Sequence, residues 1–238
     1  MNKTLYFNRI DSNLNWRIED AYATSGEFPI FSIADGVTIP EYPEKKSPTP
    51  PRIIADIFCK KTIEYLSLKY PSISEKEICD AYNYANVFIK DFYLKNKTEF
   101  DRGTTGCVVF RDKDYILGSR FLDAGFAVLR AGEIIFKTPE FWSWQKENNS
   151  GKRSNYINLI EDLSPHIQIY KVEYKIGDIL ILYTDGFEKQ LNLKDFINLF
   201  KEDRLNLIQK KLEQIDKHLS ILNPKDYGDE RSLLVVRL

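Results

Sequence analysis

The sequence predicts one α+β domain in which antiparallel sheets, joined by hairpins, are covered by helices. The expected elements run as strands, two helices, many strands, one helix and a last strand, whereas a parallel fold would alternate strands with helices. No boundary resembles a flexible linker and no segment repeats, so we expect a single domain over residues 1–238. A hydrophobic fraction of 43% is ample for a large core and argues against a disordered chain.

Strands are predicted where short apolar runs or alternating apolar residues are bounded by turn residues. The predicted strands cover residues 4–9, 19–25, 29–35, 105–110, 115–117, 121–129, 133–136, 167–174, 179–183 and 232–238. The pairs Asp112-Lys113 and Ala131-Gly132 suit tight hairpin turns, which favour antiparallel pairing of the strands on either side.

Three helices are predicted from apolar residues that recur every three or four positions. The first follows a proline-rich loop that ends with Thr49 as the N-cap; Pro50 and Pro51 form its first turn, and its apolar positions recur over residues 52–68. The second follows Ser74, which forms a capping box with Glu77. The third begins at 205 and continues to 219. Each of these helices has an apolar face with which to cover a sheet.

Charge and apolar content exclude several classes of protein. Lys plus Arg (34) nearly balance Asp plus Glu (35), so the total charge suggests neither a nucleic-acid binder nor a polybasic membrane anchor. The N-terminus lacks the apolar stretch of a signal peptide, and no window approaches the roughly 18 apolar residues of a spanning helix. The three cysteines lack Cys-x-x-Cys pairing and resemble reduced core thiols. We therefore expect a cytoplasmic monomer that binds neither nucleic acid nor membrane.

Carboxylates stand at the ends of several predicted strands. Two apolar runs each stop at an Asp-Gly pair, at Asp35 and at Asp185, and further acidic residues occur at Glu19, Asp20 and Asp229. A single Asp-Gly pair is usually a turn. If the strand ends converge, like charges about 4 Å apart repel by about 4 kcal/mol per pair at an effective dielectric of about 20. A hard divalent cation such as Mg²⁺ or Mn²⁺ removes that repulsion and prefers oxygen ligands.

Short motifs around these carboxylates resemble the metal-dependent serine/threonine protein phosphatases, the PPM or type 2C family. The motifs, in the family's order, are R-x-E-D (17–20), ADG (34–36), GTT (103–105), LR-x-G (129–132), GDILILYTDG (177–186) and GDERSLLVV (228–236). The resemblance spans nearly the whole chain. It implies a four-layer α-β-β-α sandwich, two antiparallel β-sheets flanked by helices, with a metal site at one end of the sheets.

The resemblance also implies a ligand set for two Mn²⁺ or Mg²⁺ ions. Asp35 would bridge the two ions. The carbonyl of Gly36 and the side chain of Glu19 would bind one of them, while Asp185 and Asp229 would hold the other. Two such ions would share a hydroxide that attacks the phosphorus of a phosphate ester in line.

The remaining site residues follow the family pattern less closely. Asp20 would orient water bound to the metals. Relatives place a phosphate-binding arginine where this chain has Asn15, so Arg17 is either the phosphate clamp or a surface arginine. Asp123 either helps to bind a third, weaker metal or is a turn residue. Val37, not a histidine, comes directly after the Asp35-Gly36 pair, so the histidine that donates a proton in some relatives is missing.

Two further regions differ from the family pattern. Residues 139–165 form the least regular segment, at the place of a flap beside the site in relatives; a solvated loop with packed tryptophans is the alternative. Glu230, after the predicted ligand Asp229, is expected to face water or Arg231. Both histidines, His166 and His218, are expected at the surface.

The implied function is metal-dependent hydrolysis of phosphoserine and phosphothreonine in a protein substrate, by attack of a metal-bridging hydroxide. The expected partner is a serine/threonine kinase or its target. One alternative is a catalytically weak or inactive pseudophosphatase that serves as a binding or regulatory module. The missing histidine and the shifted arginine leave that alternative open. Another is a hydrolase of small phosphate esters.

Overall fold

The computed structural model describes residues 4–9, 19–37, 48–96, 103–140, 157, 161–202, 204–222 and 230–238. Within these ranges every β-strand pairing is antiparallel. None of the helices in the same ranges has the length and apolar character that crossing a bilayer requires.

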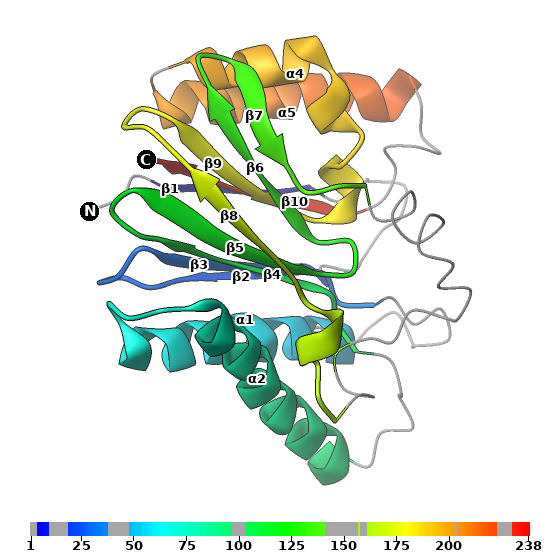
Figure 1. Ribbon diagram of the computed structural model, residues 1–238. Helices are drawn as coiled ribbons and strands as arrows, with labels where there is room; N and C mark the ends of the chain where they lie inside the picture. Colours follow the sequence, from blue (N-terminus) through cyan, green and yellow to red (C-terminus); the bar gives the residue numbers. More distant parts are fainter. Residues whose placement is uncertain are drawn as a thin grey trace.

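Two five-stranded sheets stack face to face. The β9 sheet has the order β1 (Thr4–Arg9), β10 (Arg231–Arg237), β9 (Ile179–Tyr183), β6 (Gly125–Arg130) and β7 (Glu133–Lys137). The β3 sheet has the order β2 (Ala21–Thr24), β3 (Ile30–Ala34), β4 (Gly106–Arg111), β5 (Tyr115–Phe121) and β8 (Gln168–Glu173). Figure 1 shows helices outside each sheet, which confirms the predicted α+β class and the four-layer sandwich.

Three apolar layers hold the sandwich together. The layer between the sheets includes Ile33, Val109 and Leu182, all of them fully buried. A second layer packs the β3 sheet against α1 (Pro50–Lys69) and α2 (Glu75–Asn96). The third packs the β9 sheet against α4 (Lys194–Asn198) and α5 (Leu205–Leu222). Strand residues therefore alternate between two buried faces, which explains the nearly continuous apolar runs in the central strands.

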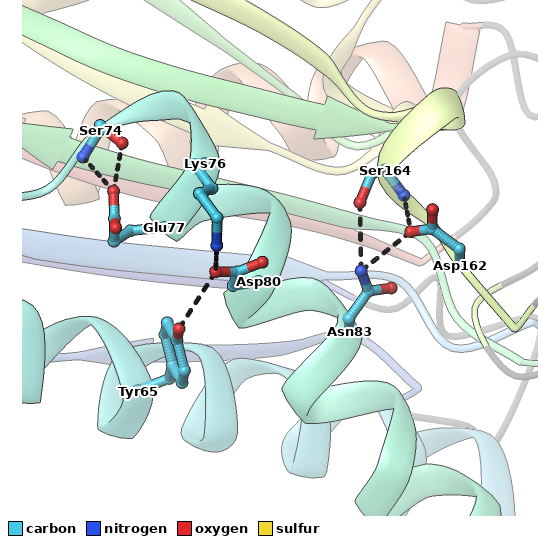
Figure 2. A network of polar contacts seen from close by, with 8 residues as sticks. All are labelled: Tyr65, Ser74, Lys76, Glu77, Asp80, Asn83, Asp162 and Ser164. Atoms are coloured by element: carbon cyan, nitrogen blue, oxygen red, sulfur yellow. Dashed lines mark hydrogen bonds and ion pairs between the residues drawn. The ribbon is translucent and has the colours of Figure 1, made fainter.

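Local signals set the starts of α1 and α2. The Thr49 side chain accepts the Arg52 N–H at 3.3 Å, so the predicted N-cap is confirmed. The helix begins at Pro50, which confirms that the two prolines lie in its first turn, a position that suits proline. One half of the predicted capping box is present, since the Ser74 N–H donates to the Glu77 carboxylate at 3.1 Å; the Ser74 hydroxyl donates to the same carboxylate (Figure 2).

The end of the irregular 139–165 segment is anchored on α2, as Figure 2 shows. The Asn83 amide donates to Asp162 at 3.0 Å and to the Ser164 hydroxyl at 3.1 Å, and its oxygen accepts the Leu163 N–H at 2.9 Å. Most of the predicted flap lies outside the described residues and stays a prediction.

The segment between β9 and α5 contains short helices that the sequence analysis did not predict. They are α4 and the 3₁₀ turns η2 (Asp185–Phe187), η3 (Gln190–Asn192) and η4 (Leu199–Lys201). A further 3₁₀ turn, η1 (Ser164–His166), precedes β8. The long helix predicted from residue 205 is confirmed as α5 and continues to Leu222.

The prediction of one strand over 121–129 is wrong. β5 ends at Phe121 and β6 starts at Gly125, because Leu122 takes a left-handed backbone conformation (φ 65°) and turns the chain. The turn leads from β5 of the β3 sheet to β6 of the β9 sheet, so Asp123 lies in a turn and not in a strand. The Ala131-Gly132 turn has the positive φ angles of a tight hairpin (50° and 79°), as expected.

Candidate functional site

The end of the sandwich opposite the chain termini carries the candidate site. Figure 1 places both termini at one end, and β10 runs toward the C-terminus, so its first residue lies at the other end. Because the neighbouring strand β9 is antiparallel to β10, its last residue, Tyr183, lies at this same end. Asp185 comes two residues after Tyr183. The order of the strands thus brings several acidic residues to one end of the sandwich.

Asp35 follows β3 directly, as its sequence position predicts. Its N–H donates to the Thr105 hydroxyl at 3.3 Å, and its carbonyl accepts the Thr105 N–H at 2.9 Å and the Thr104 hydroxyl at 2.6 Å. These bonds fix the main chain without using the carboxylate.

Gly36 lies where the backbone segments at Glu19 and Pro51 approach the end of β3 closely. Its N–H donates to the Glu19 carbonyl at 3.3 Å. A Cβ at this position would lie 2.5 Å from the Pro51 carbonyl oxygen and 2.9 Å from the Glu19 carbonyl oxygen. Only glycine therefore lets the first turn of α1 and the start of β2 approach the tip of β3 this closely.

Asp20 is buried (1% exposed) and is held from the other sheet. The Thr184 hydroxyl, which follows β9, donates to Asp20 Oδ2 at 2.9 Å and accepts the Ser232 N–H at 2.9 Å. The Ser232 side chain also hydrogen-bonds Asp20, and it contacts the Tyr6 hydroxyl at 3.0 Å. The orientation of Asp20 is therefore set by residues of the β9 sheet.

Glu230 is half-buried, and its carboxylate contacts the main chain before β2, which the expectation of water or Arg231 did not include. Its Oε2 accepts the N–H of Glu19 and, at 3.3 Å, that of Asp20. These two main-chain N–H groups compete with water for the Glu230 carboxylate, and their hydrogen bonds orient it toward Glu19 and Asp20. No local signal in the sequence distinguishes Glu230, apart from its place next to Asp229.

Asp185 and Asp123 reach the site on two turns. Asp185 opens the 3₁₀ turn after β9, and the next residue, Gly186, lies close against the start of β10. Asp123 follows the left-handed residue Leu122. Its Oδ1 atom is buried and has no hydrogen-bond partner in the described part of the chain.

The carboxylates of these residues lie close enough for each to be affected by the negative charge of the others. Burial raises the pKa of Asp35 well above its usual range, and the charges of Asp20, Asp185, Asp123 and Glu230 raise it further. Burial and then Glu230 raise the pKa of Asp20, against the hydrogen bonds that it accepts, and Asp185 adds to the rise. The structure therefore brings Asp20, Asp35, Asp123 and Asp185 within electrostatic range.

Arg120 is the second residue that the sequence analysis missed. Its guanidinium is buried (2% exposed), donates to the Leu122 carbonyl at 2.7 Å and also donates to the Pro139 carbonyl. Burial raises the pKa of Asp123, and the positive charge of Arg120 opposes that rise. Arg120 thus supports the turn that carries Asp123 through the nearby Leu122 carbonyl and ties it to Pro139, 19 residues further along the chain.

The oxygen atoms of these carboxylates are the kind of ligand that a hard divalent cation prefers. Among the described residues, no three His, Cys, Asp or Glu side chains meet the spacing of a metal site. The predicted ligand Asp229 and the predicted phosphate clamp Arg17 lie outside those residues. The fit rests on oxygen donors, on the Asp123 oxygen without a partner, and on the close backbone approach at Gly36.

Comparison with solved structures shows a shared fold over the whole chain. The serine/threonine phosphatase PstP/Ppp of Mycobacterium tuberculosis matches with a TM-score of 0.70 and 14% identity, over 100% of this chain and 99% of that chain. The PstP catalytic domain in complex with two manganese ions matches with a TM-score of 0.67 and 14% identity, over 100% and 99%. PppA, a key regulatory component of T6SS in Pseudomonas aeruginosa, matches with a TM-score of 0.68 and 14% identity, over 99% and 97%.

The chain therefore has the fold of the PPM-type serine/threonine phosphatases, and the resemblance seen in the sequence is confirmed at the level of the fold. The sequence itself matches no family model and no curated protein. His166 and His218 are exposed, as predicted.

Proposed function

We propose that this chain is a metal-dependent phosphoprotein phosphatase that hydrolyses phosphoserine and phosphothreonine. The observation that carries the proposal is the shared electrostatic environment of Asp20, Asp35 and Asp185, which come from both sheets. Such repulsion at a partly buried site is relieved by divalent cations. A fold shared with phosphatases, one of them solved with two manganese ions, supports the same reaction.

The proposed metal ligands are carboxylates and one carbonyl oxygen. Glu19 and Gly36 are assigned to one Mn²⁺ or Mg²⁺ ion, Asp185 and Asp229 to the other, and Asp35 to both. When bound, two such ions supply an activated water and offset the charge of the phosphoryl group. Of these residues, Asp229 lies outside the described part of the chain, and its role rests on the motif that contains it.

Three further residues receive roles around these ligands. Asp20 is assigned to orient the attacking water, since its carboxylate is held in place by the Thr184 hydroxyl. Arg17 is assigned to grip the substrate phosphate. Asp123 is assigned to a third, weaker metal site, which is supported by its buried oxygen without a described partner.

Hydrolysis of p-nitrophenyl phosphate tests the proposal. We expect turnover with added Mn²⁺, loss of turnover with EDTA, and loss of at least about 100-fold in Asp35→Asn and Asp185→Asn, because each removes a ligand charge. Asp114→Asn, at an exposed turn, is the matched control. Equal rates in the wild type and both site variants would refute the assignment.

A pseudophosphatase is the second candidate. The missing histidine after the Asp35-Gly36 pair and the asparagine at position 15, where relatives have arginine, favour it. Mn²⁺ binding without hydrolysis, or no Mn²⁺ binding at all, would support this alternative over the enzyme.

The substrate class is tested separately. We propose a phosphorylated protein, a serine/threonine kinase or its target, as the substrate of a cytoplasmic monomer. A panel of phosphopeptides compared with small phosphate esters measures the preference through kcat/KM. Higher kcat/KM on the small esters would instead indicate a small-ester hydrolase.

A further inference from the structure

The start of β10 ties the two sheets together at the site. Glu230 immediately precedes β10 of the β9 sheet, whereas Glu19 and Asp20 precede β2 of the β3 sheet. One carboxylate oxygen of Glu230 nevertheless accepts the N–H groups of both Glu19 and Asp20. Two successive N–H groups that converge on one anionic oxygen form a nest, and hydrogen bonds to a charged acceptor are stronger than neutral ones.

The same residue also packs against the turn that carries Asp185. A Cβ on Gly186 would lie 2.7 Å from the Glu230 carbonyl oxygen, so the two backbones are in close contact. The Thr184 N–H donates to the Ser232 carbonyl at 3.1 Å and holds the turn on β10. Glu230 therefore stands between the acidic residues that one sheet contributes and those that the other contributes.

We propose that Glu230 is a positioning residue: its carboxylate holds the Glu19–Asp20 backbone against the turn at 184–186. The inference rests on the proposed function, because the spacing that Glu230 sets is the spacing between the carboxylates assigned to metals and water. Without this clamp, the start of β2 would keep its link to the β9 sheet through the Thr184–Asp20 hydrogen bond. Glu19 would lose the hydrogen bond from its N–H and keep the one that its carbonyl accepts from the Gly36 N–H.

Glu230 affects the site in two separable ways, as a hydrogen-bond acceptor and as a negative charge. The carboxylate accepts two N–H groups, and its negative charge adds to the repulsion that raises the pKa of Asp20 and Asp35. Glu230→Gln keeps an acceptor oxygen and removes the charge, whereas Glu230→Ala removes both. Glu133→Ala, at the exposed hairpin between β6 and β7, is the matched control.

Mn²⁺ affinity, measured by calorimetry and by electron paramagnetic resonance of free Mn²⁺, is the first readout. Loss of an outer partner of a metal site weakens affinity by about 10–100-fold, and we expect a weakening in this range for Glu230→Ala. For Glu230→Gln we expect a loss several times smaller, because the hydrogen bonds persist. A full loss in Glu230→Gln would show that Glu230 acts by charge and would overturn the positioning role.

Exchange of the Glu19 and Asp20 amide hydrogens, followed by NMR, is the second readout and does not depend on activity. We expect protected amides in the wild type and in Glu230→Gln, and exchange at least about tenfold faster in Glu230→Ala. Unchanged protection in Glu230→Ala, or unprotected amides in the wild type, would overturn the clamp. If Glu230→Ala does not fold, Glu230→Met replaces it, because methionine has a similar length without an oxygen acceptor; unchanged amide protection in Glu230→Met would overturn the clamp. Protected amides in a wild type that binds no Mn²⁺ would refute the proposed function and leave the clamp intact.

Discussion

Replacing Asp35 with asparagine should stabilise the metal-free protein and abolish its stabilisation by metal. Burial and four neighbouring carboxylates raise the Asp35 pKa well above its ordinary value of 3.8, so its charged form is unfavourable in the folded state at pH 7. Removal of an unfavourable charge commonly stabilises a protein by about 0.5–2 kcal/mol. We therefore expect Asp35→Asn to raise the metal-free unfolding free energy by an amount in this range, at about 2–4 °C in Tm for each kcal/mol.

The sign of the pH dependence follows from the same shift. Above the ordinary pKa of 3.8 and up to the raised folded pKa, folded Asp35 holds more protons than the unfolded chain. The free energy of unfolding therefore falls as the pH rises through that window. The metal-free wild type should lose stability from about pH 4 upward, and Asp35→Asn should lose less.

Urea unfolding with and without Mn²⁺ measures both effects. At a Mn²⁺ concentration of 100 Kd, the wild type should gain about 2.7 kcal/mol. Asp35→Asn should gain little, because it lacks the bridging charge. The matched control Asp114→Asn should behave as the wild type in both conditions. A metal-free Asp35→Asn that is less stable than the wild type at pH 7, with Mn²⁺ stabilisation retained, would refute the carboxylate-repulsion argument.

Two further substitutions test contacts at the site, and a third tests an ion pair at the opposite end of the sandwich, where Asp178 lies beside the C-terminal residue. Gly36→Ala should cost about 2–3 kcal/mol, since its Cβ would overlap two backbone carbonyls; Gly26→Ala, in open space, should change stability little in the same urea titration. Asp178→Asn should cost about 1–3 kcal/mol in urea unfolding, because Asp178 accepts two bonds from Arg130 at 2.8 and 2.9 Å; an unchanged midpoint would contradict this. Thr184→Val should cost about 2 kcal/mol by thermal unfolding, because it leaves Asp20 and the Ser232 N–H without their shared hydroxyl, and Thr184→Ser should restore most of the loss.

Local patterns account for what the sequence predicted about this protein. Apolar runs and turn residues predicted the strands, and a capping residue such as Thr49 marked a helix start, because these signals act over a few neighbouring residues. Asp35 and Asp185 could be assigned to strand ends for the same reason. The order of the motifs was sufficient to predict the sandwich fold.

Tertiary structure decided the contacts between residues that are distant in the chain. Glu230 turned inward because two main-chain N–H groups some 210 positions earlier offered it stronger partners than water. The break at Leu122 and the buried Arg120 beside it arise from sheet packing, which overrides the apolar run that predicted a single strand. Composition and spacing do not indicate which strand ends meet in space, so the proximity of Asp20 to Asp35 is evident only in the folded chain.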